Sequence, residues 1–161
     1  ARQFQDSDLI PFISSMIKKY KVDPSQLEFE ITESLSMSNI EGTLKTLTHM
    51  KNIGVSISID DFGTGYSSLS YLKKFPVNIV KIDKSFVMDI TSDEEDKIIV
   101  QTIISMAHSL GFRTVAEGVE TLEHVKLLKE MECDQLQGYH FSKAVTKDEF
   151  ENFLKDYTPN S

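Results

Sequence analysis

The sequence predicts an α/β fold in which about five parallel strands alternate with helices. Short runs rich in β-branched residues recur along the chain, and an amphipathic helical pattern separates each run from the next. Acidic residues directly follow several of these runs: Glu30, the pair Asp60 and Asp61, and Glu117. Because parallel strands end at one edge of their sheet, where α/β proteins keep their chemistry, we expect these carboxylates to converge.

The strands are predicted from short stretches of β-branched, aromatic and other apolar residues. In chain order they cover residues 27–31, 55–60, 77–82, 113–116 and 133–138. The second is the clearest, because isoleucine and valine alternate there with serine. The last is the least regular.

Helices are predicted where apolar residues recur at helical spacing, over 8–20, 39–52, 66–74, 92–110, 122–131 and 146–157. Pro24 and Pro76 follow the ends of the first and third helices. Ser92 is expected to cap the long helix over 92–110, with Glu95 closing a capping box and Gly111 ending the helix.

The chain should therefore form about five strand–helix units after one additional helix. Such units build either an open doubly wound sheet or about five eighths of a TIM (β/α)8 barrel. Acids at the ends of several successive strands favour the partial barrel, since barrel sites draw residues from many strands. We expect one domain over residues 1–157 and a frayed tail over 158–161.

Composition limits the possible functions. With 40% hydrophobic and 26% charged residues among 161, the chain is ordinary for a globular domain. Its net charge of −8 argues against binding to a DNA or RNA polymer, which needs clustered lysine and arginine. One cysteine, Cys133, excludes an internal disulfide, so a cytoplasmic location is expected. No run is apolar and long enough to span a membrane, so direct membrane contact is not expected.

The clustered acids suit a metal site. Hard divalent cations take carboxylate ligands, and Asp60 with Asp61 after a β-type run is the most specific signal. Glu30 and Glu33 alone could be a solvated strand end, and the aspartates could instead cap the next helix. Carboxylates about 5 Å apart repel by about 3 kcal/mol per pair at an effective dielectric near 20. A bound divalent cation is the simplest way to remove this repulsion.

Lys81 lies within the third predicted strand, on the face that carries Val77 and Ile79. A lysine on such a face is costly unless it reaches water at the strand end or meets anions. Glu117 ends the fourth strand, and Glu120 lies one turn further on, where a helix N-terminus would also favour an acid. Gln137 ends the last strand and indicates little by itself.

These residue types suit metal-assisted hydrolysis of a phosphate ester. Carboxylates would position two cations and a lysine would orient the attacking water or neutralise charge. A magnesium-dependent enolising barrel enzyme could use the same groups.

Five motifs together resemble the EAL domain family: Glu30-Ile-Thr-Glu33-Ser34, Asp60-Asp61-Phe-Gly-Thr-Gly-Tyr-Ser-Ser68, Lys81-Ile-Asp83, Ala116-Glu-Gly-Val-Glu120 and Gln137-Gly-Tyr139. Their order and spacing match over nearly the whole chain. The resemblance implies a TIM barrel with one antiparallel strand. It also implies hydrolysis of cyclic di-GMP to pGpG in bacteria, with Mg²⁺ or Mn²⁺ in a two-metal site.

By the same resemblance, several residues acquire expected roles. Lys81 matches the lysine that holds the attacking water, Glu33 matches the acid that anchors the loop over 62–68, and Gln137 matches a supporting catalytic position. The candidate metal residues are Glu30, Asp60, Asp61, Glu117 and Glu120, with Asp61 on the second metal and Glu120 in a supporting position.

The chain also departs from the family pattern. The Glu-x-Leu motif with its substrate-binding arginine is absent, and so is an asparagine metal ligand. The opening Ala1-Arg2-Gln3-Phe4 resembles the segment that directly follows the asparagine motif, so we expect the N-terminal strands of the domain to be missing.

Three functional hypotheses follow from this pattern. The first is the carboxyl-terminal part of a phosphodiesterase that is inactive by itself. The others are a non-catalytic cyclic di-GMP receptor and a dimerisation module. Open strand edges should favour a homodimer or a swapped assembly.

Overall fold

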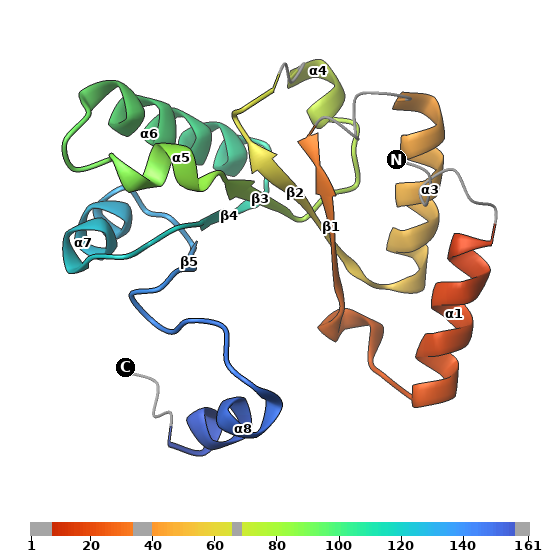
Figure 1. The fold of residues 1–161 in the computed structure, drawn as a ribbon. Coiled ribbons are helices and arrows are strands. Elements are labelled where there is room, and N and C mark those ends of the chain that lie inside the picture. The colour runs from red at the N-terminus through yellow and green to blue at the C-terminus, as the bar shows by residue number, and fades with distance from the viewer. Residues whose placement is uncertain (1–7, 34–39, 66–68, 157–161) are drawn as a thin grey trace.

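The computed structural model describes residues 8–33, 40–65 and 69–156. At its centre lies a parallel sheet of five strands in the order β1-β2-β3-β4-β5 (Figure 1). The strands are β1 (Glu28–Thr32), β2 (Ser56–Phe62), β3 (Ile79–Ile82), β4 (Arg113–Ala116) and β5 (Gln135–Leu136). A doubly wound sheet changes direction at a switch point in its strand order. The unbroken sequential order is instead that of a barrel wall, which the carboxylate pattern favoured.

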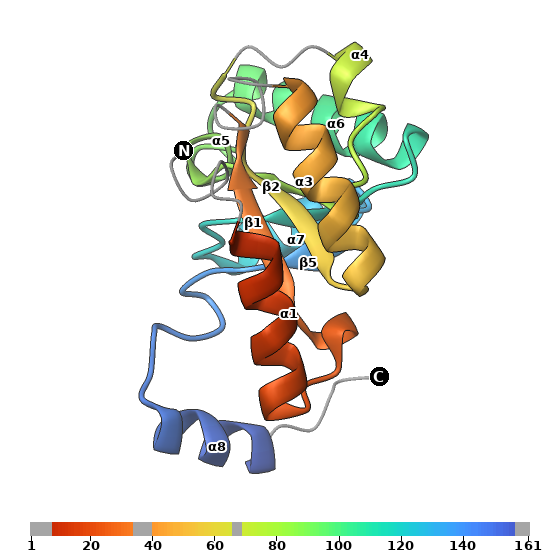
Figure 2. The same cartoon turned by 90° about the vertical axis from the view of Figure 1, so that its right-hand side faces the viewer.

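The helices connect the strands and cover the sheet. They are α1 (Leu9–Tyr20), the 3₁₀ turn η2 (Pro24–Gln26), α3 (Ile40–Ile53), α4 (Leu69–Leu72), α5 (Lys84–Met88), α6 (Glu94–Ser109), α7 (Leu122–Glu130) and α8 (Lys147–Asp156). Helix α1 packs against α3, α3 against β2, and α6 against β3 and β4 (Figure 2). Among the described residues, no helix is long and apolar enough to cross a membrane.

The two faces of the sheet differ in character. Residues that alternate along the strands point to opposite faces. One face is apolar and forms the core with the helices, including Ile31, Ile57, Ile59, Val80 and Ile82. The register aligns Glu30 with Ser58, and Ser58 with Ile79, so the other face carries Glu30, Asp60 and Lys81. This division places the polar side chains together, away from the helices.

Two details of the helices differ from expectation. Helix α5 follows β3 directly and was not predicted, because five residues are too few to show an apolar period. Helix α6 begins at Glu94 with Asp93 as its N-cap, not Ser92, because the Asp93 carboxylate accepts hydrogen bonds from the N–H groups of Glu95 and Asp96. Residues 66–68 of the helix expected over 66–74 lie outside the described residues, and α4 covers only Leu69–Leu72.

The last predicted strand is also shorter than expected. Regular pairing with β4 covers only Gln135 and Leu136, although the Gln137 N–H still donates to the Ala116 carbonyl. Beyond it the chain leads to α8, which lies apart from the sheet in both views (Figures 1 and 2). The exposed apolar side chains of α8 are Phe150, Phe153 and Leu154.

Candidate active site

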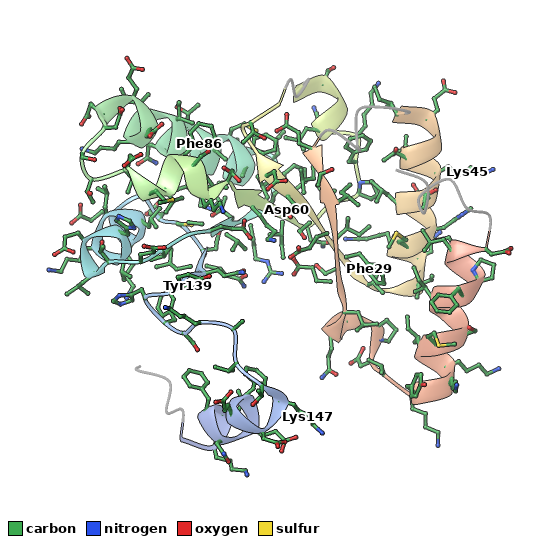
Figure 3. The ribbon with its side chains drawn as sticks, viewed as in Figure 1. Phe29, Lys45, Asp60, Phe86, Tyr139 and Lys147 are labelled. Carbon is green, nitrogen blue, oxygen red and sulfur yellow. The ribbon has the colours of Figure 1, made fainter. Side chains whose placement is uncertain are left out.

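Lys81 lies at the centre of the polar strand ends. Its Nζ lies 2.7 Å from Glu30 Oε1, 3.0 Å from Asp60 Oδ1 and 2.8 Å from Glu117 Oε1. The three carboxylates come from β1, from β2 and from the residue after β4, while Lys81 belongs to β3. Figure 3 shows Asp60 at the middle of the molecule, where these strands meet. The sheet therefore brings residues far apart in sequence into one group.

Burial and charge act in opposite directions on Lys81. The side chain is only 5% exposed. Burial by itself lowers the pKa of the ammonium, but hydrogen bonds to Glu117, Glu30 and Asp60 more than offset this and raise the pKa above its ordinary value. Lys81 is therefore a permanent cation among the carboxylates at physiological pH.

Asp61 projects differently from Asp60 because the backbone changes conformation between them. The pairing of β2 with β3 shifts register between Ile59 and Phe62, and Asp61 has φ 54°, in the left-handed region. Carboxylate oxygens of Asp60, Asp61 and Glu117 consequently lie within 4.8 Å of one another. Partial burial raises the pKa of Asp61, and the charges of Asp60 and Asp83 raise it further.

Asp83 is a residue of this site that the sequence did not single out for a role. Its negative charge helps to raise the pKa of Asp61, and it caps α5 by accepting the Ser85 N–H at 2.9 Å. Burial raises the pKa of Asp83, but the hydrogen bonds from Ser85 outweigh burial and lower it overall. The signal that could have found Asp83 is its position two residues after Lys81, on the same face by the strand period.

Glu33 supports the loop that follows β2. Its side chain is buried, and Oε2 accepts the N–H of Gly63 at 2.9 Å and of Gly65 at 3.4 Å. A β-carbon on Gly65 would lie 2.9 Å from Glu33 Oε1, so the glycine permits this close approach. Glu33 therefore holds the loop that begins just after Asp61 through two backbone amides.

Glu120 and Gln137 do not join the Lys81 group. They line a neighbouring cavity of about 370 Å³ together with Lys84, Met88, Glu117 and Tyr139. Two backbone hydrogen bonds connect the segment after β4 to the segment after β5. The Val119 N–H donates to the Gln137 carbonyl, and the His140 N–H donates to the Val119 carbonyl. Glu117 therefore connects the cavity to the carboxylate cluster.

The donor set at the cluster fits a divalent metal ion. Asp60, Asp61 and Glu117 offer only oxygen ligands at short mutual distance, as hard cations such as Mg²⁺ and Mn²⁺ require. Glu30 Oε1 lies 2.7 Å from Lys81 Nζ but does not belong to this group of three. Among the described residues, Asp60, Asp61 and Glu117 are the acids that come close enough together to share one ion, and Glu120 is not among them.

Fold and site together define a class: a (β/α) barrel wall whose strand ends gather carboxylates around a buried lysine. The chain matches the EAL domain over residues 1–144. It therefore belongs to the EAL domain family. Similarity to solved EAL domains confirms the prediction of five parallel strands as part of a TIM barrel.

Known proteins with similar sequence and structure agree with this assignment. NbdA of Pseudomonas aeruginosa, a cyclic di-GMP phosphodiesterase, is 47% identical over 131 residues, which are 81% of this chain and 17% of NbdA. The MucR phosphodiesterase in complex with cyclic di-GMP, from the same species, superposes with a TM-score of 0.89 at 36% identity. That match covers 92% of this chain and 60% of the solved MucR chain.

A second solved structure contains a metal. BlrP1 of Klebsiella pneumoniae, solved with manganese and cyclic di-GMP, has a TM-score of 0.81 and 31% identity. The match covers 88% of this chain and 36% of that one. Since the chain spans only part of each of these proteins, their whole-protein activities bear on it only as a proposal.

Proposed function

We propose that this chain is the carboxyl-terminal part of a metal-dependent phosphodiesterase that hydrolyses cyclic di-GMP to pGpG. The observation that carries the proposal is the convergence of Glu30, Asp60 and Glu117 on Lys81, beside Asp61. Family relatives that are cyclic di-GMP phosphodiesterases support it. The substrate is acidic, so a net-negative site needs additional positive charge before it can accept a phosphodiester.

Asp60, Asp61 and Glu117 offer oxygens within 4.8 Å of one another and would form the core of the cation site. As the family resemblance implies, Glu30 would join Asp60 and Glu117 on one Mg²⁺ or Mn²⁺ and Asp61 would hold a second, with Glu120 in support. When bound, such ions activate water and stabilise the oxygens of an in-line displacement. Lys81 has N–H groups that can donate hydrogen bonds to the oxygen of an attacking water or of a phosphate, and its raised pKa keeps it charged for that role.

The remaining candidates would position the substrate. Glu33 holds the loop after Asp61 through the Gly63 and Gly65 amides. Gln137 lines the cavity beside Glu117 and presents an amide that can donate to and accept from a nucleotide. The chain lacks the Glu-x-Leu arginine and the asparagine ligand of the family pattern, so we expect it alone to hydrolyse cyclic di-GMP poorly.

The test uses the longer protein that would contain this chain. Conversion of cyclic di-GMP to pGpG is measured with Mn²⁺ for the unchanged protein and for Asp60→Asn. The proposal expects turnover that falls by at least about 100-fold in the variant, because a ligand charge is lost at the reacting centre. Nucleotide binding without turnover in the unchanged protein would instead support the receptor hypothesis.

We also propose self-association of the chain. Within the described residues, β1 and β5 each pair on one side only, which leaves two strand edges open. The exposed apolar residues of α8 add surface that a second copy could cover. Light scattering should give a mass of at least twice 18.3 kDa, and a monomer at all concentrations would contradict the proposal. A cytoplasmic location stays a prediction from the lone cysteine.

A further inference from the structure

Lys81 is enclosed by negative charge on three sides. Its ammonium contacts one carboxylate from β1, one from β2 and one from the residue after β4, at 2.7, 3.0 and 2.8 Å. The partner carboxylates are unequally buried, with exposed fractions of 50% for Glu30, 23% for Asp60 and 20% for Glu117. One side chain on β3 therefore contacts acids carried by three neighbouring segments of the sheet.

The charges around Lys81 do not balance. With Asp61 the cluster has four carboxylates and one ammonium. In the part of the chain that the structure describes, the ion pairs of Glu30, Asp60 and Glu117 all lead to Lys81 and to no other lysine or arginine. Partly buried carboxylates without a counter-charge repel one another strongly. When no other cation is present, the Lys81 ammonium is therefore the group that offsets the repulsion between these carboxylates.

We infer that Lys81 is the built-in counter-cation of the site, which stabilises the metal-free fold and weakens the binding of divalent cations. The two effects have one cause. The ammonium neutralises part of the charge that a cation would otherwise neutralise, and it also repels that cation. The inference rests on the proposed function for the existence of a cation site. It goes beyond that function by making Lys81 the residue that sets fold stability and cation affinity.

A neutral side chain at position 81 should separate the two effects. Lys81→Met keeps a long, flexible chain in the buried position but removes the charge. In EDTA, the melting temperature should fall by about 10 °C, because three carboxylates lose their partner. Added Mn²⁺ should raise the melting temperature of the variant more than that of the unchanged chain. In calorimetric titration the variant should bind Mn²⁺ at least about tenfold more tightly.

Lys97→Met is the matched control. Lys97 pairs with Glu94 at 3.5 Å on the exposed surface of α6, where an ion pair contributes little. This variant should melt within about 1 °C of the unchanged chain, with and without Mn²⁺.

If Lys81→Met does not fold in EDTA, two further measurements decide. Circular dichroism should show folding on addition of Mn²⁺. A double variant with Glu117→Gln should recover structure in EDTA, because one of the unpaired charges is gone. A double variant that stays unfolded in EDTA would show that Lys81 acts by packing and would overturn the inference.

Three other results would also overturn it: an unchanged melting temperature of Lys81→Met in EDTA, equal Mn²⁺ shifts in the variant and the unchanged chain, or weaker Mn²⁺ binding by the variant. The EDTA measurement involves neither nucleotide nor metal. It therefore tests the counter-cation role even if the longer protein hydrolyses no cyclic di-GMP.

Discussion

Glu33 Oε2 accepts the backbone N–H of Gly63 at 2.9 Å, although 30 residues separate the two along the chain. The same oxygen accepts the Gly65 N–H at 3.4 Å, so one buried carboxylate holds two backbone amides of the loop after β2. That loop starts next to Asp61, whose left-handed backbone turns its carboxylate toward Asp60 and Glu117. Glu33 therefore connects the loop conformation to the geometry of the carboxylate cluster.

Replacing Glu33 by alanine should release this loop. Loss of a buried, charged acceptor shared by two backbone amides should cost about 2 kcal/mol in the free energy of unfolding. Hydrogen exchange at Gly63 and Gly65 should accelerate well beyond that of the core strands. Glu33→Gln is the control, since its side-chain carbonyl can still accept the same bonds. Equal exchange rates at these glycines in both variants would contradict the anchoring role.

Gly138 is expected to tolerate no side chain. A β-carbon there would lie 2.1 Å from the Val119 carbonyl oxygen and 2.3 Å from its nitrogen, and both are backbone atoms that cannot move aside. Gly138→Ala should therefore cost about 3 kcal/mol in urea unfolding. The segments carrying Glu117 and Gln137 should be displaced from each other as a result.

The control for Gly138→Ala is Gly111→Ala. Gly111 has φ 79° but no atom within 4 Å of the added β-carbon. The substitution there should cost only the backbone strain, about 1 kcal/mol. A Gly138→Ala variant as stable as Gly111→Ala would show that the contact with Val119 relaxes easily.

The position of single site residues was predictable, but their mutual contacts were not. Glu30, Asp60 and Glu117 each follow a recognisable β-type run, and parallel strands must end at the same edge. That Lys81 contacts all three carboxylates depends on the register between strands, and no single strand encodes the register. The left-handed backbone of Asp61 likewise depends on the register shift between β2 and β3. The regular alternation of residues over 55–60 gives no sign of that shift.

Asp134 provides a pH-dependent contact remote from the carboxylate cluster. Its Oδ2 lies 2.8 Å from each of three donors: the Thr114 N–H, the Thr114 hydroxyl and His108 Nε2. Burial raises the pKa of Asp134, but the hydrogen bonds from His108 and Thr114 outweigh it and hold the pKa below its ordinary value of 3.8. A carboxyl with a lowered folded-state pKa stabilises the fold above 3.8 and loses that effect as pH falls through the folded value.

Asp134→Asn should therefore destabilise the chain by about 1 kcal/mol at pH 7, discounted for partial exposure. The difference from the unchanged chain should shrink below pH 3.8 and vanish as the carboxyl is protonated. Urea unfolding at a series of pH values measures this. A constant difference from pH 7 to pH 3 would mean that packing, not charge, explains the effect.

Asp61 should be the cluster residue whose neutralisation stabilises the metal-free chain. Its carboxylate is repelled by Asp60 and Asp83, while Lys81 contacts the other acids directly. Asp61→Asn removes that repulsion and keeps a residue type that tolerates φ 54°. In EDTA it should stabilise the chain by only about 0.5 kcal/mol, because the Asp61 side chain itself is exposed and solvent screens its repulsion.

Asp61→Ala separates charge from backbone conformation. It removes the same charge but places a less tolerant residue in the left-handed conformation, at a cost of about 1 kcal/mol. The alanine variant should therefore be less stable than the asparagine variant by roughly that amount in thermal unfolding.

Both variants should gain less stability from Mn²⁺ than the unchanged chain, because both lack a carboxylate that would hold the ion. If Asp61→Asn were destabilising in EDTA, Asp61 would be a favourable partner of Asp83 rather than a repelled charge, and its proposed role in holding a second cation would lose its electrostatic basis.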